Sequence, residues 1–220
     1  MEERKVKISY HMKLLEKAIL EKGCVYPGNI LKVDSFLNHQ IDVTLMDRLG
    51  DEFYQHFKDQ GITKVMTIEA SGIAIACSVA RTMGVPILFA KKSRSKNIGK
   101  DVFTSKVSSY TYGKDYGITV SRNYLSASDK VLLVDDFLAY GNAMKGLIDI
   151  CSQAGSQIAG IGICIEKGFQ KGGDELRKMG YDVMSLAIID SLSEDGTITF
   201  REQIHVSFSI HTVTGPGAES

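Results

Sequence analysis

The residues best suited to chemistry lie in one run, VLLVDDFLAYGNA, at positions 131–143. Its apolar start predicts a buried parallel strand, and Asp135 and Asp136 follow at the carboxyl end, where open α/β sheets bind ligands. Small residues then lead into a helical pattern that Gly155 can end. Amides at a helix start favour a phosphate, and carboxylates accept hydrogen bonds from sugar hydroxyls. A ribose 5-phosphate suits both parts of this run, the two acids and the small-residue loop. The alternative, a solvated acidic turn, does not need the small-residue loop.

The rest of the chain predicts strands and helices in alternation around this run. Strands are expected at 30–33, 64–68, 86–90, 130–134, 158–165 and 183–188. Helices are expected at 14–22, at 43–57 with Asp42 as N-cap, and at 73–83, 144–154 and 173–179. This βαβ order predicts an α/β fold with a mainly parallel sheet flanked by helices.

Residues 91–119 interrupt the alternation with a basic, serine-rich and glycine-punctuated segment. The second half could form a β-hairpin, whereas the first half has little apolar content. Two interpretations remain open, a solvated surface excursion and a flexible loop that closes over a neighbouring diphosphate site as a lid.

Composition favours a single domain that binds a small molecule. The chain has 220 residues with 26 basic and 26 acidic side chains, so no charge excess points to nucleic acid or a membrane surface. The start of the chain has no secretory apolar core, and we expect a cytoplasmic protein. The four cysteines lack ligand or disulfide spacing, which favours reduced thiols. We expect a tag or extension at 1–11, one domain at 12–207 and a disordered tail at 208–220.

The 131–143 run resembles the 5-phosphoribosyl 1-diphosphate (PRPP) motif of type I phosphoribosyltransferases, a strand ending in two acids followed by a phosphate loop. The resemblance implies that family's fold, with a small hood built from both ends of the chain. It assigns the ribose hydroxyls and catalysis to Asp135 and Asp136. The phosphate loop would be Ala139, Tyr140, Gly141, Asn142 and Ala143. Hydroxyl residues common in the family are replaced here by Tyr140, Asn142 and Ala143, so backbone amides must carry more of the binding.

Two earlier segments match the diphosphate side of the same family. In TIEASGIAIA, the residues Glu69, Ala70, Ser71 and Gly72 would present amides to the diphosphate at a helix start, with an unusual peptide conformation expected there. The alternative is an ordinary serine cap. Lys91, which follows the PILFA strand, matches a lysine that approaches the diphosphate, and Lys92 could assist it; the alternative is a surface lysine.

The segments ILKVDSFLNHQID and IGICIEKGFQKGGDEL narrow the resemblance to the xanthine phosphoribosyltransferases of Gram-positive bacteria. This resemblance places Leu31 and Asn38 in a purine pocket under the hood and sets Lys167 against the base. An amine donor suits the carbonyl of a 6-oxopurine, and an amide can donate to a second carbonyl. Phe169 would either stack on the base or fill core. The alternatives for Asn38 and Lys167 are a turn residue and a solvated lysine at a strand end.

The resemblance implies transfer of phosphoribose from PRPP to N9 of xanthine, with Mg2+ carried mainly by PRPP and no metal ligand expected from the protein. It also implies a homodimer. Transfer to hypoxanthine or guanine is the main alternative. A PRPP-sensing regulator on the same fold would need an added DNA-binding module, for which the sequence has neither spare length nor a basic face.

Overall fold

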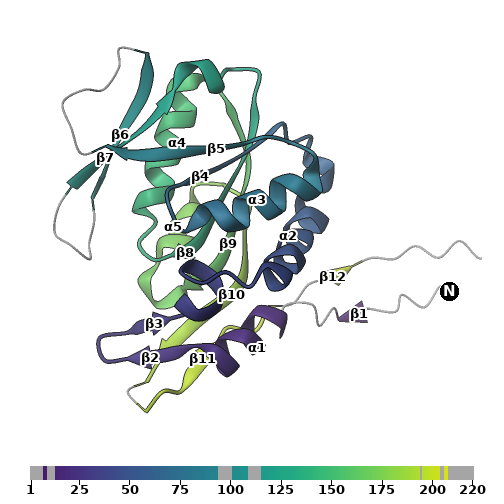
Figure 1. Ribbon diagram of the computed structural model, residues 1–220, viewed down its shortest axis with the longest axis vertical. Coiled ribbons are helices and arrows are strands. Elements are labelled where there is room, and N and C mark those ends of the chain that lie inside the picture. Colours follow the sequence, from purple (N-terminus) through teal and green to yellow (C-terminus); the bar gives the residue numbers. More distant parts are fainter. Residues whose placement is uncertain are drawn as a thin grey trace, which may run out of the picture.

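The structure is a computed structural model that describes residues 7–8, 13–93, 101–108, 115–193, 195–203 and 206–207 (Figure 1). Its α-helices are α1 (Lys13–Lys22), α2 (Val43–Phe57), α3 (Gly72–Met83), α4 (Asn142–Ala154) and α5 (Gly172–Lys178). The first six strands are β1 (Lys7–Ile8), β2 (Cys24–Tyr26), β3 (Ile30–Lys32), β4 (Lys64–Ile68), β5 (Ile87–Ser93) and β6 (Val102–Ser108). The others are β7 (Asp115–Ser121), β8 (Lys130–Leu138), β9 (Gln157–Lys167), β10 (Val183–Leu192), β11 (Ile198–Phe200) and β12 (Val206–Ser207).

An eight-stranded sheet in the order β11-β10-β9-β8-β4-β5-β7-β6 forms the centre of the fold. The five strands from β10 to β5 are parallel, whereas β11 pairs antiparallel with β10 at one edge, and β7 pairs antiparallel with both β5 and β6 at the other. The prediction of a mainly parallel α/β sheet is confirmed. β8 lies between β9 and β4, so the acid-bearing strand occupies the middle of the sheet.

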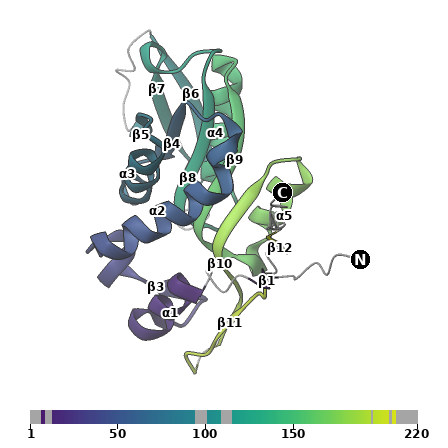
Figure 2. The same cartoon turned by 90° about the vertical axis from the view of Figure 1, so that its right-hand side faces the viewer.

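Helices cover both faces of this sheet. Figure 2 shows α2 and α3 on one side and α4 on the other. Alternation along β8 explains the two layers, because Leu132 and Val134 pack with α2 and α3 while Val131 and Leu133 pack with α4. Each predicted helix is present. Asp42 caps α2 as expected, since its carboxylate accepts a 3.1 Å hydrogen bond from the amide of Leu45.

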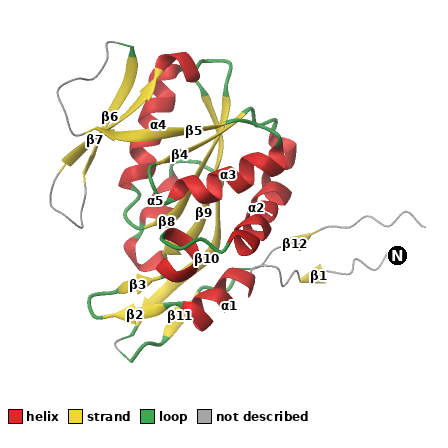
Figure 3. Ribbon diagram, in the orientation of Figure 1, coloured by secondary structure: helices red, strands yellow, loops and turns green. Residues whose placement is uncertain are grey.

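The hood gathers at one end of the molecule from both ends of the sequence (Figure 3). It contains α1, the β2–β3 hairpin, a π-helical turn at Asp34–Asn38, and β11 beside the end of β10. The buried side chains of Ile19 and Phe36 belong to the same core cluster as Leu186 of β10. This shared core fixes the hood against the carboxyl end of β10.

Several strands differ from the sequence predictions. The hairpin strand β2 and the edge strand β11 were not expected, because each has only three residues. β8 and β9 are longer than predicted, and Asp135 and Asp136 lie within β8 rather than after it. The pairing of β8 with β4 ends at Leu133, whereas pairing with β9 continues to Leu138, so the acids lie where β8 has a partner on one side only.

Several predictions fall wholly or partly outside the described residues. The predicted hairpin is present as β6 and β7, but 94–100 and 109–114 of the predicted lid lie outside them. The predicted tail at 208–220 also lies outside, and of 1–11 only Lys7 and Ile8 are described, paired with β12. All four cysteines are free thiols, two buried and two exposed. In the described part of the chain no helix is long and apolar enough to cross a bilayer.

Candidate active site

The two adjacent acids of β8 are both almost completely buried. Asp135 and Asp136 are each 6% exposed, and the amide of Asp136 donates a 3.0 Å hydrogen bond to Oδ1 of Asp135. Both carboxylates lie against the start of α3, Asp136 at Ser71 and Asp135 at Gly72.

Asp136 joins three parts of the chain. Its Oδ1 accepts a 2.9 Å hydrogen bond from the Ser71 hydroxyl, and its Oδ2 accepts a 3.1 Å hydrogen bond from the side-chain amide of Asn38. Ser71 precedes α3, but its side chain makes no capping bond to that helix. The interpretation of Ser71 as an ordinary cap is therefore wrong, and the predicted diphosphate loop contacts the predicted ribose acid directly.

Asp135 lies against the start of α3. A Cβ atom added to Gly72 would stand 2.5 Å from Oδ1 of Asp135 and 2.1 Å from the hydroxyl of Thr67, so only glycine allows this approach. Burial raises the pKa of Asp135 well above its usual range, and the charge and the side-chain hydrogen bonding of Asp136 raise it further, whereas the backbone amide of Asp136 lowers it. The charge of the Lys92 ammonium also lowers this pKa. The Thr67 hydroxyl is buried and has no hydrogen-bond partner within the described structure.

The predicted diphosphate loop has an unusual backbone, as expected from its sequence. The peptide bond between Glu69 and Ala70 is cis. The amide of Glu69 donates a 3.1 Å hydrogen bond to the carbonyl of Ala90, and its carboxylate accepts one from the amide of Lys92. These bonds tie the loop to β5.

Lys92, predicted as a possible assistant of Lys91, is near enough to Asp135 for its charge to lower the pKa of that acid, and the contact of Lys91 with the diphosphate stays a prediction. The two lysines alternate on β5, so their side chains point to opposite faces. The Lys92 ammonium lies 5.5 Å from the ring centroid of Tyr116, a residue of β7. Burial raises the pKa of Tyr116, and the charge of Asp135 raises it further. Sequence reasoning missed Tyr116, because only the pairing of β5 with β7 brings it to the acids.

The predicted phosphate loop forms a tight turn into α4. Gly141 has a φ of 77°, in the left-handed region, and directly precedes the helix. Ala139 accepts a 3.1 Å hydrogen bond from the amide of Gly172. A Cβ atom on Gly172 would lie 2.3 Å from the Ala139 carbonyl oxygen, so the loop packs directly against the start of α5. Tyr140 is 39% exposed, whereas Asn142 and Ala143 already belong to the first turn of α4.

The residues predicted to contact the base lie in the hood and at the carboxyl end of β9. Lys167 donates a 3.1 Å hydrogen bond to the carbonyl of Asn29 in the β2–β3 turn, and partial burial lowers its pKa. Leu31 is 7% exposed, and its side chain is part of the core. Phe169 is partly buried and packs against the same core, the second of the two interpretations left open for it. Their contacts with a base stay predictions.

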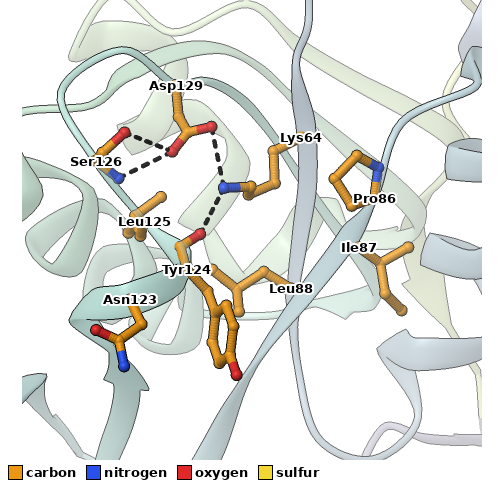
Figure 4. A pocket seen from close by; sticks show the side chains of 9 residues that line it. All are labelled: Lys64, Pro86, Ile87, Leu88, Asn123, Tyr124, Leu125, Ser126 and Asp129. Carbon is orange, nitrogen blue, oxygen red and sulfur yellow. Dashed lines mark hydrogen bonds and ion pairs between the residues drawn. The ribbon is translucent and has the colours of Figure 1, made fainter.

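A pocket of about 530 Å³ lies elsewhere, at the amino ends of β4 and β5 (Figure 4). The Lys64 ammonium there is held by an ion pair with Asp129 and by the carbonyl of Tyr124. The acids lie toward the carboxyl ends of the parallel strands. This pocket is at the amino ends of these strands, so it lies at the opposite end of the sheet from the acids. Among the described side chains, no group of three or more His, Cys, Asp or Glu residues is arranged to hold a metal ion.

The sequence of this chain matches a known family. The family model described as "Phosphoribosyl transferase domain" matches residues 32–199. The chain belongs to the phosphoribosyltransferase family. A xanthine phosphoribosyltransferase of Bifidobacterium adolescentis is 56% identical over 192 residues, which cover 86% of this chain and 100% of that protein. One from Ruminiclostridium cellulolyticum is 53% identical over 191 residues, covering 87% and 100%.

Solved structures agree on the type I phosphoribosyltransferase fold. The APRTase of Giardia lamblia complexed with 9-deazaadenine superposes with a TM-score of 0.67 at 25% identity, covering 79% of this chain and 96% of that one. The adenine phosphoribosyltransferase of Saccharomyces cerevisiae gives a TM-score of 0.65 at 20% identity, covering 79% and 98%. At such identities the likeness concerns the fold, and the base is a separate question.

Proposed function

We propose that this phosphoribosyltransferase transfers the 5-phosphoribosyl group of PRPP to N9 of xanthine, forming xanthosine 5'-monophosphate and diphosphate. The observation that carries the proposal is the convergence of Asn38, Ser71 and Asp135 on Asp136 beside the phosphate loop. The names of relatives that are more than half identical over their full length support xanthine as the base.

The chemistry follows from where charge develops. The bond from C1 of ribose to the diphosphate oxygen breaks, the bond to N9 forms on the opposite face, and the N9 proton is lost. Positive charge grows on the ribose, and negative charge grows on the leaving diphosphate. Asp135 and Asp136 hold the ribose hydroxyls and stabilise the cation, whereas Lys91, Lys92 and the amides of 70–72 stabilise the diphosphate; the amide of Glu69 is already bound to the carbonyl of Ala90.

Mg2+ would be carried mainly by the oxygens of PRPP. Among the described side chains no group of three or more His, Cys, Asp or Glu residues is arranged to hold a metal ion, so this proposal requires no protein cage. When bound, the ion would neutralise charge on the diphosphate. A homodimer in the cytoplasm is our expectation from the family resemblance, and light scattering on the purified protein tests the dimer.

Base choice depends on donors. Lys167 can donate to the 6-carbonyl shared by xanthine, guanine and hypoxanthine, and the second amide proton of Asn38 can donate to a carbonyl that hypoxanthine lacks. Adenine offers an amine in place of the 6-carbonyl and leaves Lys167 unpaired. These donors favour xanthine over the other 6-oxopurines and disfavour adenine.

One assay tests the proposal. The purified protein is incubated with PRPP, Mg2+ and each of the four purines, and nucleotide formation is measured by chromatography. We expect kcat/KM to be highest for xanthine and lower for adenine by about 10² or more. The Asp135→Asn, Asp136→Asn double variant serves as the blank. Preference for adenine would contradict the xanthine assignment, and no PRPP-dependent nucleotide with any base would contradict the transferase.

A further inference from the structure

A partly buried ion pair joins β9 to α5, with its carboxylate enclosed and its arginine side chain 32% exposed, and no step of the proposed chemistry uses it. Glu166, the penultimate residue of β9, is 1% exposed. Its Oε1 and Oε2 accept hydrogen bonds of 2.9 and 2.8 Å from the two terminal nitrogens of Arg177. The Ser185 hydroxyl also donates to Oε2. Burial acts to raise the pKa of Glu166, but these hydrogen bonds outweigh it and leave the pKa below the usual value.

Two consecutive glycines pack α5 against this pair and against the phosphate loop. A Cβ atom on Gly173 would stand 2.0 Å from Oε1 of Glu166 and 2.8 Å from Nη1 of Arg177. On the other side, a Cβ atom on Gly172 would stand 2.7 Å from the amide nitrogen of Gly141. Arg177 belongs to α5 as well, so the ion pair fastens α5 to β9. The start of α5 is thus fixed between the ion pair and the loop.

The position of Glu166 in the sheet links the two substrate sides. Glu166 pairs with Leu138 of β8, the residue directly before the phosphate loop, and with Ile188 of β10. Its neighbour in the chain is Lys167, the predicted base contact. A shift of α5 relative to β9 would therefore move the loop relative to Lys167.

We propose that Glu166 and Arg177 are positioning residues that hold Gly172 against the phosphate loop and so set the loop amides for the 5-phosphate of PRPP. This inference rests on the proposed function. Because a bidentate arginine fixes both distance and direction, the pair keeps the loop in its binding geometry before PRPP arrives. The pair touches no reacting atom, so its loss should weaken PRPP binding more than it slows the chemical step.

The test measures PRPP affinity by calorimetry with Mg2+ and no base, followed by kcat and KM with xanthine. We expect Arg177→Met to raise the PRPP dissociation constant and KM by about tenfold, because a small displacement of a binding group is costly, with kcat within about threefold. Arg177→Lys keeps the charge without the fork and should recover part of the affinity. Lys64→Met is the control, since it breaks a 3.0 Å, largely buried ion pair with Asp129 at the opposite end of the parallel strands.

A second route avoids variants that do not fold. Removing one member of this partly buried ion pair costs stability, so Glu166→Gln, which keeps the side chain's shape, and Gly172→Ala, which presses on the loop directly, are measured as well. Either one should raise the PRPP dissociation constant, whereas Lys64→Met should lower the melting temperature and leave that constant unchanged. Unchanged affinity in the folded variants, or an equal loss in Lys64→Met, would overturn the inference alone. A wild-type protein that binds no PRPP would overturn the proposed function with it.

Discussion

The side-chain amide of Asn38 donates a 3.1 Å hydrogen bond to Oδ2 of Asp136, although the two residues are 98 positions apart. Asn38 ends the π-helical turn of the hood, and Asp136 lies in the central strand of the sheet. The bond therefore sets the predicted base side of the site beside the predicted ribose side. A single residue can act on both, and its replacement should show which role dominates.

Replacing Asn38 tests its role toward the base. We expect Asn38→Ala to lower kcat/KM for xanthine by about 10- to 100-fold, the effect of losing a hydrogen bond to a charged or polar partner, and to affect hypoxanthine less. Ser71→Ala is the control, because it removes the other donor to Asp136 from outside the hood and should affect both bases equally. Equal losses on both bases in Asn38→Ala would restrict Asn38 to supporting Asp136.

The two acids should separate activity from stability. Asp135→Asn and Asp136→Asn should each lower kcat/KM for PRPP by about 10² or more, since a charge-assisted hydrogen bond and cation stabilisation are lost. Near-wild-type turnover in the folded double variant would remove the acids from the mechanism.

Stability of the same variants depends on pH. Because the folded pKa of Asp135 is raised, the protein binds more protons folded than unfolded, and stability falls as pH rises through that pKa. Asp135→Asn removes this loss and should raise the melting temperature at pH 8. Asp136→Asn should not, because it weakens the bonds from Ser71 and Asn38. Thermal unfolding of the wild type, Asp135→Asn and Asp136→Asn at pH 8 checks this order of melting temperatures.

The two lysines of β5 should differ in their effect on PRPP. The charge of Lys92 lowers the pKa of Asp135, and its ammonium lies 5.5 Å from the ring centroid of Tyr116. Lys91, the preceding strand residue, points to the other face of β5. We expect Lys92→Ala to raise the PRPP dissociation constant by about tenfold, as for loss of one charged hydrogen bond, and Lys91→Ala to change it less. The reverse order in calorimetric titrations would support the original assignment of Lys91 to the diphosphate.

Gly141 should be required both for backbone geometry and for binding. Its φ of 77° is costly for residues with a Cβ atom, so Gly141→Val should lower stability by about 1–2 kcal/mol and also weaken PRPP binding. Gly155, at the other end of α4 with a φ of 71°, supplies the control. Gly155→Val should lower the melting temperature comparably and leave PRPP affinity unchanged. Equal affinity in both variants would remove Gly141 from the phosphate site.

Glu52 of α2 should make stability depend on pH near neutrality. Partial burial raises its pKa to about 7 from a usual value of 4.5, with Arg48 acting in the opposite direction. Stability present below the usual value is therefore lost as pH rises through about 7. Glu52→Gln does not titrate, so its melting temperature relative to wild type should be higher at pH 8 than at pH 5. A difference that is the same at both pH values would contradict this prediction.

Local patterns in the sequence determined the elements and the centre of the site. The apolar run before Asp135 predicted a buried strand, Asp42 predicted the start of α2, and Gly141 marked the turn into α4. These features depend on neighbours within a few positions, through side-chain periodicity, capping and backbone freedom. Such signals can be identified in the sequence without knowledge of any long-range contact.

Only the tertiary structure decided which distant groups meet. The pairing of β5 with β7 brought Tyr116 beside Lys92. Packing of α5 onto β9 joined Glu166 to Arg177 and placed Gly172 on the phosphate loop. These contacts depend on strand register and on how closely two backbones can approach, which a linear pattern does not encode. The sequence alone therefore determined the ligand-binding motif, and three-dimensional packing determined the residues that support it.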